Sequence, residues 1–392
     1  MSKKMRLFVP CYYAFFSNGM MALVLGSILT YLIQEAGLSY SVAGGLLSAF
    51  AIGNLVASFI NPAIAGKIGR KKTTIILSAL IPIDLFIVSL VAPIPVLYIA
   101  CILLGIGRGS VSIINNMVVN DYDGTPLALN LLHTVFAMGA FLAPFLTSVF
   151  VNAGLNWRYI IYTVIVLSIV SVIGYTTLPL EESLNKGKKK SNEKGNSFLK
   201  SPDFYFCGLI LFFYLGVENC VNGWFVTYFK NIGIMSDTYA TNLVSVTWVV
   251  IMLGRLATGY VSKKLSKYKI MVINCACTAI FFILLIATKN LIIITASVVG
   301  LGFFFAGIYP TGISNAGEYI KGSTAGMSLL LAMAALGGII TPQIVGVIAD
   351  GSIGLTGAIT VLSINVAMML LFAIVSYIRA ERVITASKTP LL

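Results

Sequence analysis

The stretch GMMALVLGSILTY, residues 19–31, recurs in outline as GVENCVNGWFVTY, residues 216–228. Four residues recur at the same spacing: Gly19, Gly26, Thr30 and Tyr31 correspond to Gly216, Gly223, Thr227 and Tyr228. The offset of 197 residues is about half of the 392-residue chain. We therefore predict that the chain is a tandem duplication of one structural unit.

Two further sets of residues repeat at nearly the same offset. They are Gly139 and Pro144 against Gly337 and Pro342 and, more weakly, Gly105 and Gly107 against Gly300 and Gly302. In a membrane chain, two parallel repeats place a solute site between the halves, near the middle of the bilayer. This geometry is the first argument for a transporter.

The composition predicts an all-α membrane protein. Hydrophobic residues make up 58% of the chain and charged residues 10%, and the mean hydropathy is +0.96. A spanning helix needs about 20 apolar residues. We expect twelve such helices, at residues 7–33, 41–66, 73–92, 96–120, 126–153, 158–179, 203–232, 238–262, 268–287, 291–314, 323–349 and 355–378.

These spans predict two pseudo-symmetric six-helix bundles. The first bundle covers residues 1–180 and the second covers residues 203–380. A polar, basic linker at residues 181–202 joins them, and residues 381–392 form a tail. The linker and the tail are both expected on the cytoplasmic side.

Basic residues predict this orientation, because Lys and Arg collect in cytoplasmic loops. They cluster before residue 7, at residues 67–72, in the linker, at residues 263–269 and near the C-terminus, whereas the other side has only Arg158, Lys230 and Lys289. Both termini are therefore expected in the cytoplasm, with the chain in the plasma membrane. The net charge of +13 reports orientation and a mild attraction to anionic lipid, and it gives no reason to propose nucleic-acid binding.

Little in the sequence suggests an enzyme, a metal or a cofactor. All six cysteines fall inside predicted spans without the spacing of a metal site, and we interpret them as reduced, buried residues. One histidine and the absence of HExxH and GxSxG motifs leave little from which to build a catalytic site. No removable signal is expected after the first residues. A channel is disfavoured because no charged rings mark a pore mouth.

Glu218 is the strongest candidate for ion coupling. It lies about 22 Å into the seventh span, because each helical residue adds about 1.5 Å. Asn219 and Asn222 extend a polar arc that cannot sensibly face lipid. A carboxyl group at this depth can bind and release a proton as access to water alternates. A fixed structural hydrogen bond is the alternative.

A second polar stripe lies on the fourth span. Arg108, Ser112 and Asn115 stand at i, i+4 and i+7, with Asn116 further round the helix. Asp84 lies at comparable depth on the preceding span, so an Asp84–Arg108 ion pair is expected. This pair could serve as a coupling element or could be purely structural.

Other polar residues inside the spans are candidates for solute contact or for packing. Asn54, Ser58 and Asn61 form a stripe on the second span, and Asn18 lies in the middle of the first.

The fifth span carries Asn130 and His133, and the histidine is a candidate for proton transfer or packing. Trp224 points away from Glu218 on an unbroken helix and reaches the same cavity only if Gly223 loosens the helix. Tyr309, followed by Pro310, suggests a span that can bend. These aromatic side chains suit either a solute site or a helix interface.

Four segments resemble known transporter motifs. The loop GKIGRKKT (66–73) and its counterpart GRLATGYVSKK (254–264) look like the major facilitator superfamily. Within that superfamily, NLLHTVFAMGAFLAP (130–144), GVENCVNGW (216–224) and the pair Asn115/Asn116 resemble the fucose/glucose/galactose cation symporter family.

The resemblance implies uptake of a monosaccharide driven by H+ or Na+, with Glu218, Trp224, Asn116 and His133 at matching motif positions. It also implies gating at the loop residues Gly66 and Arg70 and at Arg255.

Three positions depart from the resemblance. The superfamily loop usually has an acidic residue where Gly66 stands. Relatives carry a carboxylate on the first span, where this chain has none, and another where Ser112 stands. Glu218 would then couple the ion alone, or the chain would be a facilitator or would carry a different solute.

The sequence thus predicts a sugar or small polar solute symporter that works by alternating access, without a cofactor, as a monomer. Amide side chains both donate and accept hydrogen bonds, which suits a hydroxyl-rich solute. The rival prediction is a proton-coupled antiporter for cationic, drug-like solutes in the same fold.

Overall fold

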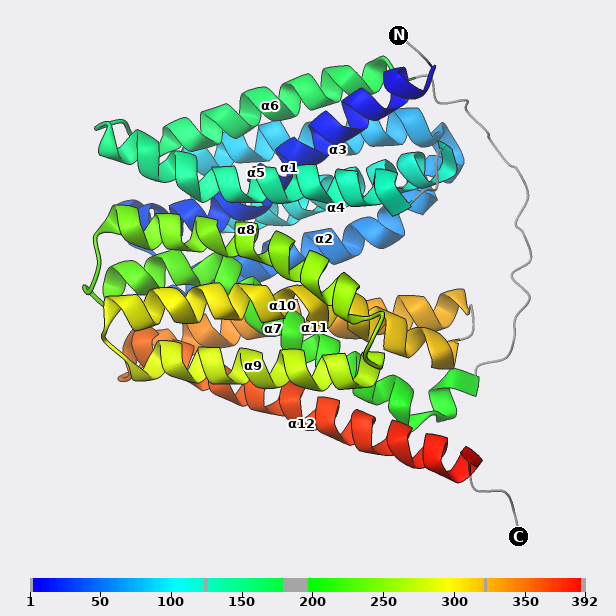
Figure 1. Ribbon diagram of the computed structural model, residues 1–392. Coiled ribbons are helices and arrows are strands. Elements are labelled where there is room, and N and C mark those ends of the chain that lie inside the picture. Colours follow the sequence, from blue (N-terminus) through cyan, green and yellow to red (C-terminus); the bar gives the residue numbers. More distant parts are fainter. Residues whose placement is uncertain (1–2, 123–125, 179–196, 321–322, 389–392) are drawn as a thin grey trace. The chain divides into compact units, whose positions relative to one another are not determined.

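The computed structural model describes residues 3–122, 126–178, 197–320 and 323–388. Over these residues the chain forms twelve α-helices and one short 3-10 helix, with no strand (Figure 1). The elements are α1 (Lys3–Ala36), α2 (Tyr40–Ile68), α3 (Arg70–Ser89), α4 (Ile94–Tyr122), α5 (Pro126–Asn152), α6 (Arg158–Thr176), η1 (Ser197–Lys200), α7 (Pro202–Asn231), α8 (Asp237–Val261), α9 (Lys267–Ala287), α10 (Leu291–Ile320), α11 (Thr324–Ala349) and α12 (Gly354–Lys388).

The twelve helices confirm the twelve predicted spans. All twelve are long and apolar enough to cross a membrane, and a helix satisfies every backbone group within itself, as lipid demands. The largest difference is α12, which ends at Lys388 rather than at residue 378. The added residues, RAERVITASK, contain no Gly or Pro to stop the helix, so it continues after the apolar run ends.

The described chain divides into two compact units. Unit 1 comprises the described residues of Met1–Lys188 with Val221–Val249 and Pro342–Thr356. Unit 2 comprises those of Lys189–Cys220 with Val250–Thr341 and Gly357–Leu392. Most of the predicted linker, residues 181–196, lies outside the described residues, as do residues 389–392 of the predicted tail.

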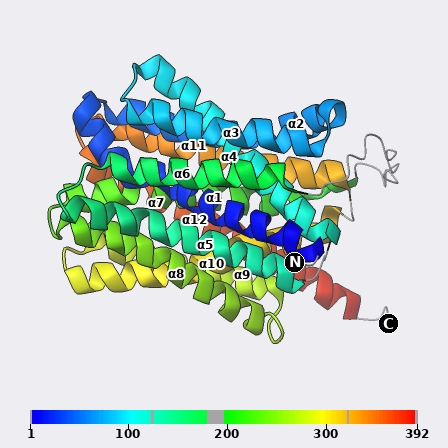
Figure 2. The ribbon, with the colours of Figure 1, turned by 90° about the horizontal axis from the view of Figure 1, so that it is seen from above.

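In unit 1, α1 packs against α5 and α6, while α4 packs against α2 and α3 (Figure 2). Glycine makes the closest of these approaches possible. A side-chain carbon on Gly139 of α5 would overlap the carbonyl oxygen of Phe16 on α1. Small residues let two membrane helices come together in this way, and dispersion between the backbones then stabilises the pair.

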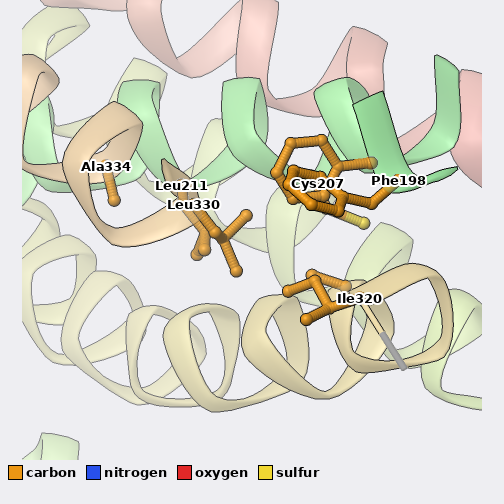
Figure 3. Close-up of a cluster of buried hydrophobic side chains, with 8 residues drawn as sticks. Phe198, Cys207, Leu211, Ile320, Leu330 and Ala334 are labelled. Carbon is orange, nitrogen blue, oxygen red and sulfur yellow. The ribbon is translucent and has the colours of Figure 1, made fainter. Parts of the chain in front are cut away.

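Unit 2 repeats this contact. A side-chain carbon on Gly337 of α11 would overlap the carbonyl oxygen of Phe212 on α7, so α7 and α11 meet as α1 and α5 do. Beside it lies a cluster of buried apolar side chains from η1, α7, α10 and α11 (Figure 3). Phe204 and Leu330 in this cluster are fully buried. The Gly139 and Gly337 repeat found in the sequence is thus a repeat of one helix crossing.

The turns that follow α1 and α7 are also alike. Gly37 and Gly233 both have positive φ, of 60° and 65°. Only glycine takes this conformation without strain, so each turn can reverse the chain in a few residues. Ser39 and Ser236 then cap the next helix by accepting a hydrogen bond from the backbone N–H three residues on. The duplication therefore extends to the loops.

Within unit 1 the matched residues of the first repeat and the second repeat meet each other. The hydroxyl groups of Thr30 and Thr227 share a hydrogen bond of 2.9 Å. One turn earlier, a side-chain carbon on Gly26 would overlap the carbonyl oxygen of Asn222, next to Gly223. Residues related by the repeat thus meet where α1 packs against the second half of α7.

Candidate functional site

Glu218 lies in unit 2, in the middle of α7, and is half buried. Its carboxyl group has a hydrogen bond with the Tyr214 hydroxyl, one turn earlier on the same helix, and the Arg255 guanidinium is in electrostatic range of the same tyrosine. The ring centroid of Tyr309 on α10 lies 6.2 Å from that of Tyr214. Tyr309 is also within electrostatic range of the Glu218 carboxyl group. Glu218 therefore faces protein groups that can support a negative charge.

The neighbouring amide, Asn219, is tied to α11. Its side chain donates a hydrogen bond of 2.9 Å to the carbonyl oxygen of Gly338. Gly338 has no side chain to block this approach, since a carbon there would collide with the Asn219 amide. This contact fixes the register of α7 against α11 beside the Glu218 carboxyl group.

Unit 1 holds a cluster of polar and aromatic side chains around Arg108 on α4, which we call the Arg108 group. The guanidinium donates a hydrogen bond of 3.0 Å to the Asn54 side-chain oxygen on α2. It also lies over the rings of Phe50 and Phe136, at 5.8 and 5.9 Å from their centroids. A cation held between two aromatic faces is stabilised by their quadrupoles.

The expected Asp84–Arg108 ion pair is not formed. Asp84 is buried on α3, with 1% of its surface exposed, and its Oδ2 atom has no hydrogen-bond partner among the described residues. Arg108 instead extends to Asn54, so the comparable depth of the two residues did not bring them together. An ionised Asp84 would thus be a buried charge without compensation.

Asn18 links α1 to α4 by donating a hydrogen bond of 3.0 Å to the Ser112 hydroxyl. It also lines a cavity of about 10 Å³ inside unit 1, together with Ser17, Ser78, Ser168 and Ser171. This volume is about the space that one water molecule needs. The side-chain oxygen of Asn18 has no partner among the described residues, so a single water molecule would suit this cavity.

Several other candidates bond within their own bundle. Asn115 is fully buried and donates hydrogen bonds of 2.7 Å to the Val111 carbonyl and the Tyr175 hydroxyl. Asn116 donates to the carbonyl oxygen of Ser112. Asn130 belongs to α5, but its side chain lies outside the described residues. His133 is exposed and packs edge-on against a neighbouring ring, that of Phe15.

Trp224 does not join Glu218. The helix α7 is continuous through Gly223, and Trp224 belongs to unit 1 whereas Glu218 belongs to unit 2. The indole N–H donates a hydrogen bond of 3.2 Å to the Pro342 carbonyl, and the ring packs on Tyr40. Asn222, also in unit 1, presents its backbone oxygen to α1.

Two of the three residues predicted for gating, Gly66 and Arg70, lie at helix ends, and Arg255 lies within α8. Gly66 is near the end of α2, where an added side-chain carbon would meet open space. Arg70 is the first residue of α3 and is exposed, as is Arg255 on α8. Arg255 lies in electrostatic range of Tyr214, the tyrosine that is hydrogen-bonded to Glu218.

Sequence reasoning missed the aromatic residues beside Arg108. Phe136 packs edge-on against Trp248 of α8, with their ring centroids 6.0 Å apart, and Trp248 is 5% exposed. Tyr214 was missed in the same way. Tyr214 and Glu218 are four residues apart on one helix, and this spacing alone would have predicted that they are neighbours. The Phe136–Trp248 contact joins two distant segments and leaves no such signal.

The comparison with family models identifies the fold and the class of protein. Residues 11–342 match the model of the Major Facilitator Superfamily. The chain belongs to the Major Facilitator Superfamily. It is therefore a multi-pass transporter rather than an enzyme, as the sequence predicted.

Two relatives of this superfamily member have names that state a solute. The chain is 24% identical over 352 residues to the glucose/mannose transporter GlcP of Bacillus subtilis, with 86% of each chain covered. It is 25% identical over 185 residues to a putative glucose/galactose transporter of Helicobacter pylori, which covers 47% of this chain and 45% of the relative.

Solved structures of the superfamily share the fold. The nucleoside transporter NupG aligns with a TM-score of 0.76 and 16% identity, covering 96% of this chain and 98% of the other. The xylose transporter XylE from E. coli aligns with a TM-score of 0.72 and 15% identity, covering 95% and 97%. At these identities the likeness concerns the arrangement of the helices.

Proposed function

We propose that the chain carries a monosaccharide or a similar small polar solute across the cytoplasmic membrane, coupled to H+ or Na+, by alternating access. The named relatives support a sugar as solute, because glucose is common to both of their names. The positions of basic residues support cytoplasmic termini. We propose that the chain works as a monomer and needs no cofactor beyond the coupling ion.

The observation that carries the coupling proposal is the setting of Glu218. Its carboxylate form has a donor in the Tyr214 hydroxyl, and the Arg255 guanidinium lies in electrostatic range of that tyrosine. A group supported in its charged form, yet placed mid-membrane, can exist both with and without its proton. Such a group can bind an ion on one side of the membrane and release it on the other.

The Arg108 group supports binding of a neutral, hydroxylated solute. Sugars bind through hydrogen bonds from their hydroxyl groups and through contact of their apolar ring faces with aromatic side chains. Arg108 and Asn54 supply the polar groups, and Phe136 and Trp248 supply aromatic surface. We propose that these four residues contact the solute.

A proton-coupled antiporter for cationic solutes is the rival function. The position of Arg108 disfavours it, because a fixed guanidinium beside the proposed solute contacts repels an organic cation. A facilitator without ion coupling is the other alternative, and only transport measurements separate it from a symporter.

Purified protein in proteoliposomes tests the proposal. A panel of hexoses, nucleosides and cationic dyes is added in turn while the external pH is recorded, first without and then with a Na+ gradient. We expect one or more hexoses to enter together with protons, or with Na+, against their own gradient. Movement of dyes with no response to sugars would favour the antiporter, and sugar entry without accumulation would favour the facilitator.

A further inference from the structure

Unit 1 contains a polar cavity that the proposed solute contacts do not use. Its volume is about 310 Å³, near the lower end of the range of about 300 to 1,000 Å³ for ligand pockets, which suits a ligand of monosaccharide size. It lies where α1 and α7 end and α2 and α8 begin. Its lining residues are Thr30, Ile33, Gln34, Tyr40, Thr227, Lys230, Asn231 and Asp237.

Part of the wall of this cavity is formed where α1 meets the second half of α7. The hydrogen bond between Thr30 and Thr227 spans the cavity wall, and one turn further in, Gly26 is in close contact with the Asn222 backbone. A ligand in the cavity would therefore rest on the line where the two repeats meet. The sequence predicts that this end of the helices faces outward, because the basic loops lie at the opposite end.

The charges in the cavity balance each other. The Lys230 side chain is 5% exposed, and its ammonium group donates a hydrogen bond of 2.7 Å to the Tyr31 hydroxyl. The Asp237 carboxylate lies 3.6 Å from the same ammonium group. An anion would be repelled by Asp237 and a cation by Lys230, so a neutral ligand is favoured.

The walls are held in place before any ligand arrives. The Tyr31 ring stacks on Trp157, at an interplanar angle of 7°. The backbone N–H of Tyr40 donates a hydrogen bond of 2.7 Å to Asp350, whose other oxygen accepts one of 2.8 Å from the backbone of Ser41. Partial burial acts to raise the pKa of Asp350, but these hydrogen bonds outweigh it and lower that pKa below its usual value.

We propose that this cavity is a second solute site, separate from the Arg108 group, which binds a neutral polyhydroxylated molecule such as a hexose. The Gln34 amide, the Tyr40 phenol and the Asp237 carboxylate provide both donors and acceptors, as a sugar requires. The inference rests on the proposed function, since it takes the same class of solute.

Thiol labelling tests the site in the purified, full-length protein. Asn231 is exposed at the cavity, so Asn231→Cys reacts with a charged maleimide, and Cys277→Ser removes the one native cysteine of the six that is not buried. At ten times its Kd, glucose should slow the labelling of Asn231→Cys about tenfold by mass action. The control is Leu155→Cys, which is 40% exposed in the turn between α5 and α6 and should label equally with or without glucose.

Two further variants separate direct protection from an indirect effect. Arg108→Ala weakens the other proposed contacts, so protection that persists in this background shows that the cavity itself binds the sugar. Asp237→Asn leaves the Lys230 charge uncompensated, so gluconate should then protect Asn231→Cys, whereas it should not protect the parent. Protection that vanishes with Arg108→Ala would overturn the inference.

The outcomes also separate this inference from the proposed function. If hexose transport is measured and no hexose protects Asn231→Cys, the second site is wrong and the transport proposal stands. If hexoses protect but are not transported, the second site stands and the transport proposal is wrong. If neither is seen, both are wrong.

Discussion

Asp84 and Glu218 are both acidic residues inside membrane-spanning helices, yet their surroundings are opposite. Asp84 is buried in unit 1 with one carboxyl oxygen lacking a partner among the described residues. Glu218 is half buried in unit 2 and is hydrogen-bonded to the Tyr214 hydroxyl, which the Arg255 charge also influences. A negative charge on Glu218 is stabilised by a hydrogen-bond donor, whereas a negative charge on Asp84 would have one carboxyl oxygen without such a donor among the described residues.

This difference indicates different roles. A coupling group must exist in two protonation states during one transport cycle, and each state must be tolerable. Glu218 meets this condition because its charged form has a hydrogen-bond donor in Tyr214. Asp84 would be an uncompensated buried charge when ionised. This cost favours its neutral, protonated form throughout the cycle, and hence a structural role. We propose that Glu218 alone carries the coupling ion.

The largest expected effect is that of Glu218→Gln, which removes the ionisable group and keeps its size. A gradient of one pH unit is worth about 1.4 kcal/mol per proton and thus about tenfold accumulation of a coupled solute. We expect the variant to lose this accumulation completely. Counterflow exchange of labelled for unlabelled sugar should continue, because exchange needs no net ion movement. Accumulation that survives the change would show that another group carries the ion.

Arg108→Ala comes next in size, because it removes a charged hydrogen-bond donor from the proposed solute contacts. Such bonds contribute about 1.5 to 3 kcal/mol, so KM for the sugar should rise about tenfold to a hundredfold with the accumulation ratio unchanged. Arg108→Lys should not restore KM, since an ammonium group lacks the planar face that covers two rings.

A double-mutant cycle with Asp84→Asn sharpens the Arg108 result. With no ion pair between the two residues, the effects of Arg108→Ala and Asp84→Asn on the free energy of unfolding should add to within about 0.5 kcal/mol. A coupling energy of 1 kcal/mol or more would mean that Asp84 and Arg108 interact in a state that the structure does not represent.

Tyr214→Phe should have a smaller effect, of several-fold. It deletes the hydroxyl donor to Glu218 and leaves the ring to pack against Phe305. The initial rate of gradient-driven sugar uptake should fall about fivefold to tenfold, the equivalent of about 1 to 1.4 kcal/mol. Phe305→Leu is the matched control, because it alters the same packing without touching a hydrogen bond. An equal loss in both variants would assign the effect to packing.

The smallest effect is expected for Asp84→Asn. The amide has the same shape and no charge, so the free energy of unfolding should change by no more than about 1 kcal/mol. Sugar accumulation should remain. Chemical denaturation and uptake assays on the same preparation check both statements, and loss of accumulation here would reverse the roles assigned to the two carboxyl groups.

The fold could be predicted almost fully from the sequence, for physical reasons. Lipid leaves a long apolar segment with one choice, the helix, so hydropathy placed all twelve elements. Matched glycines marked the helix crossings, because a side chain at Gly139 or Gly337 would collide with a backbone carbonyl. What the sequence did not place was the end of α12, which depends on the absence of helix breakers rather than on hydropathy.

The candidate site was only partly predictable. The polar character of Glu218, Arg108 and Asn54 inside apolar spans indicated that they face protein. Their partners were not predictable, because a helix face several residues wide can turn toward more than one neighbour. Asp84 shows this, since comparable depth suggested Arg108 as its partner, whereas Arg108 bonds to Asn54 of α2 instead.

The most direct test of the central claim measures protons at the binding step itself. Sugar is added to the purified protein in weakly buffered detergent solution, and proton uptake is recorded for wild type, Glu218→Gln and Asp84→Asn. With H+ as the coupling ion, we predict that wild type and Asp84→Asn take up protons as the sugar binds, and that Glu218→Gln binds the sugar without doing so. Proton uptake that is lost in Asp84→Asn and kept in Glu218→Gln would contradict the account.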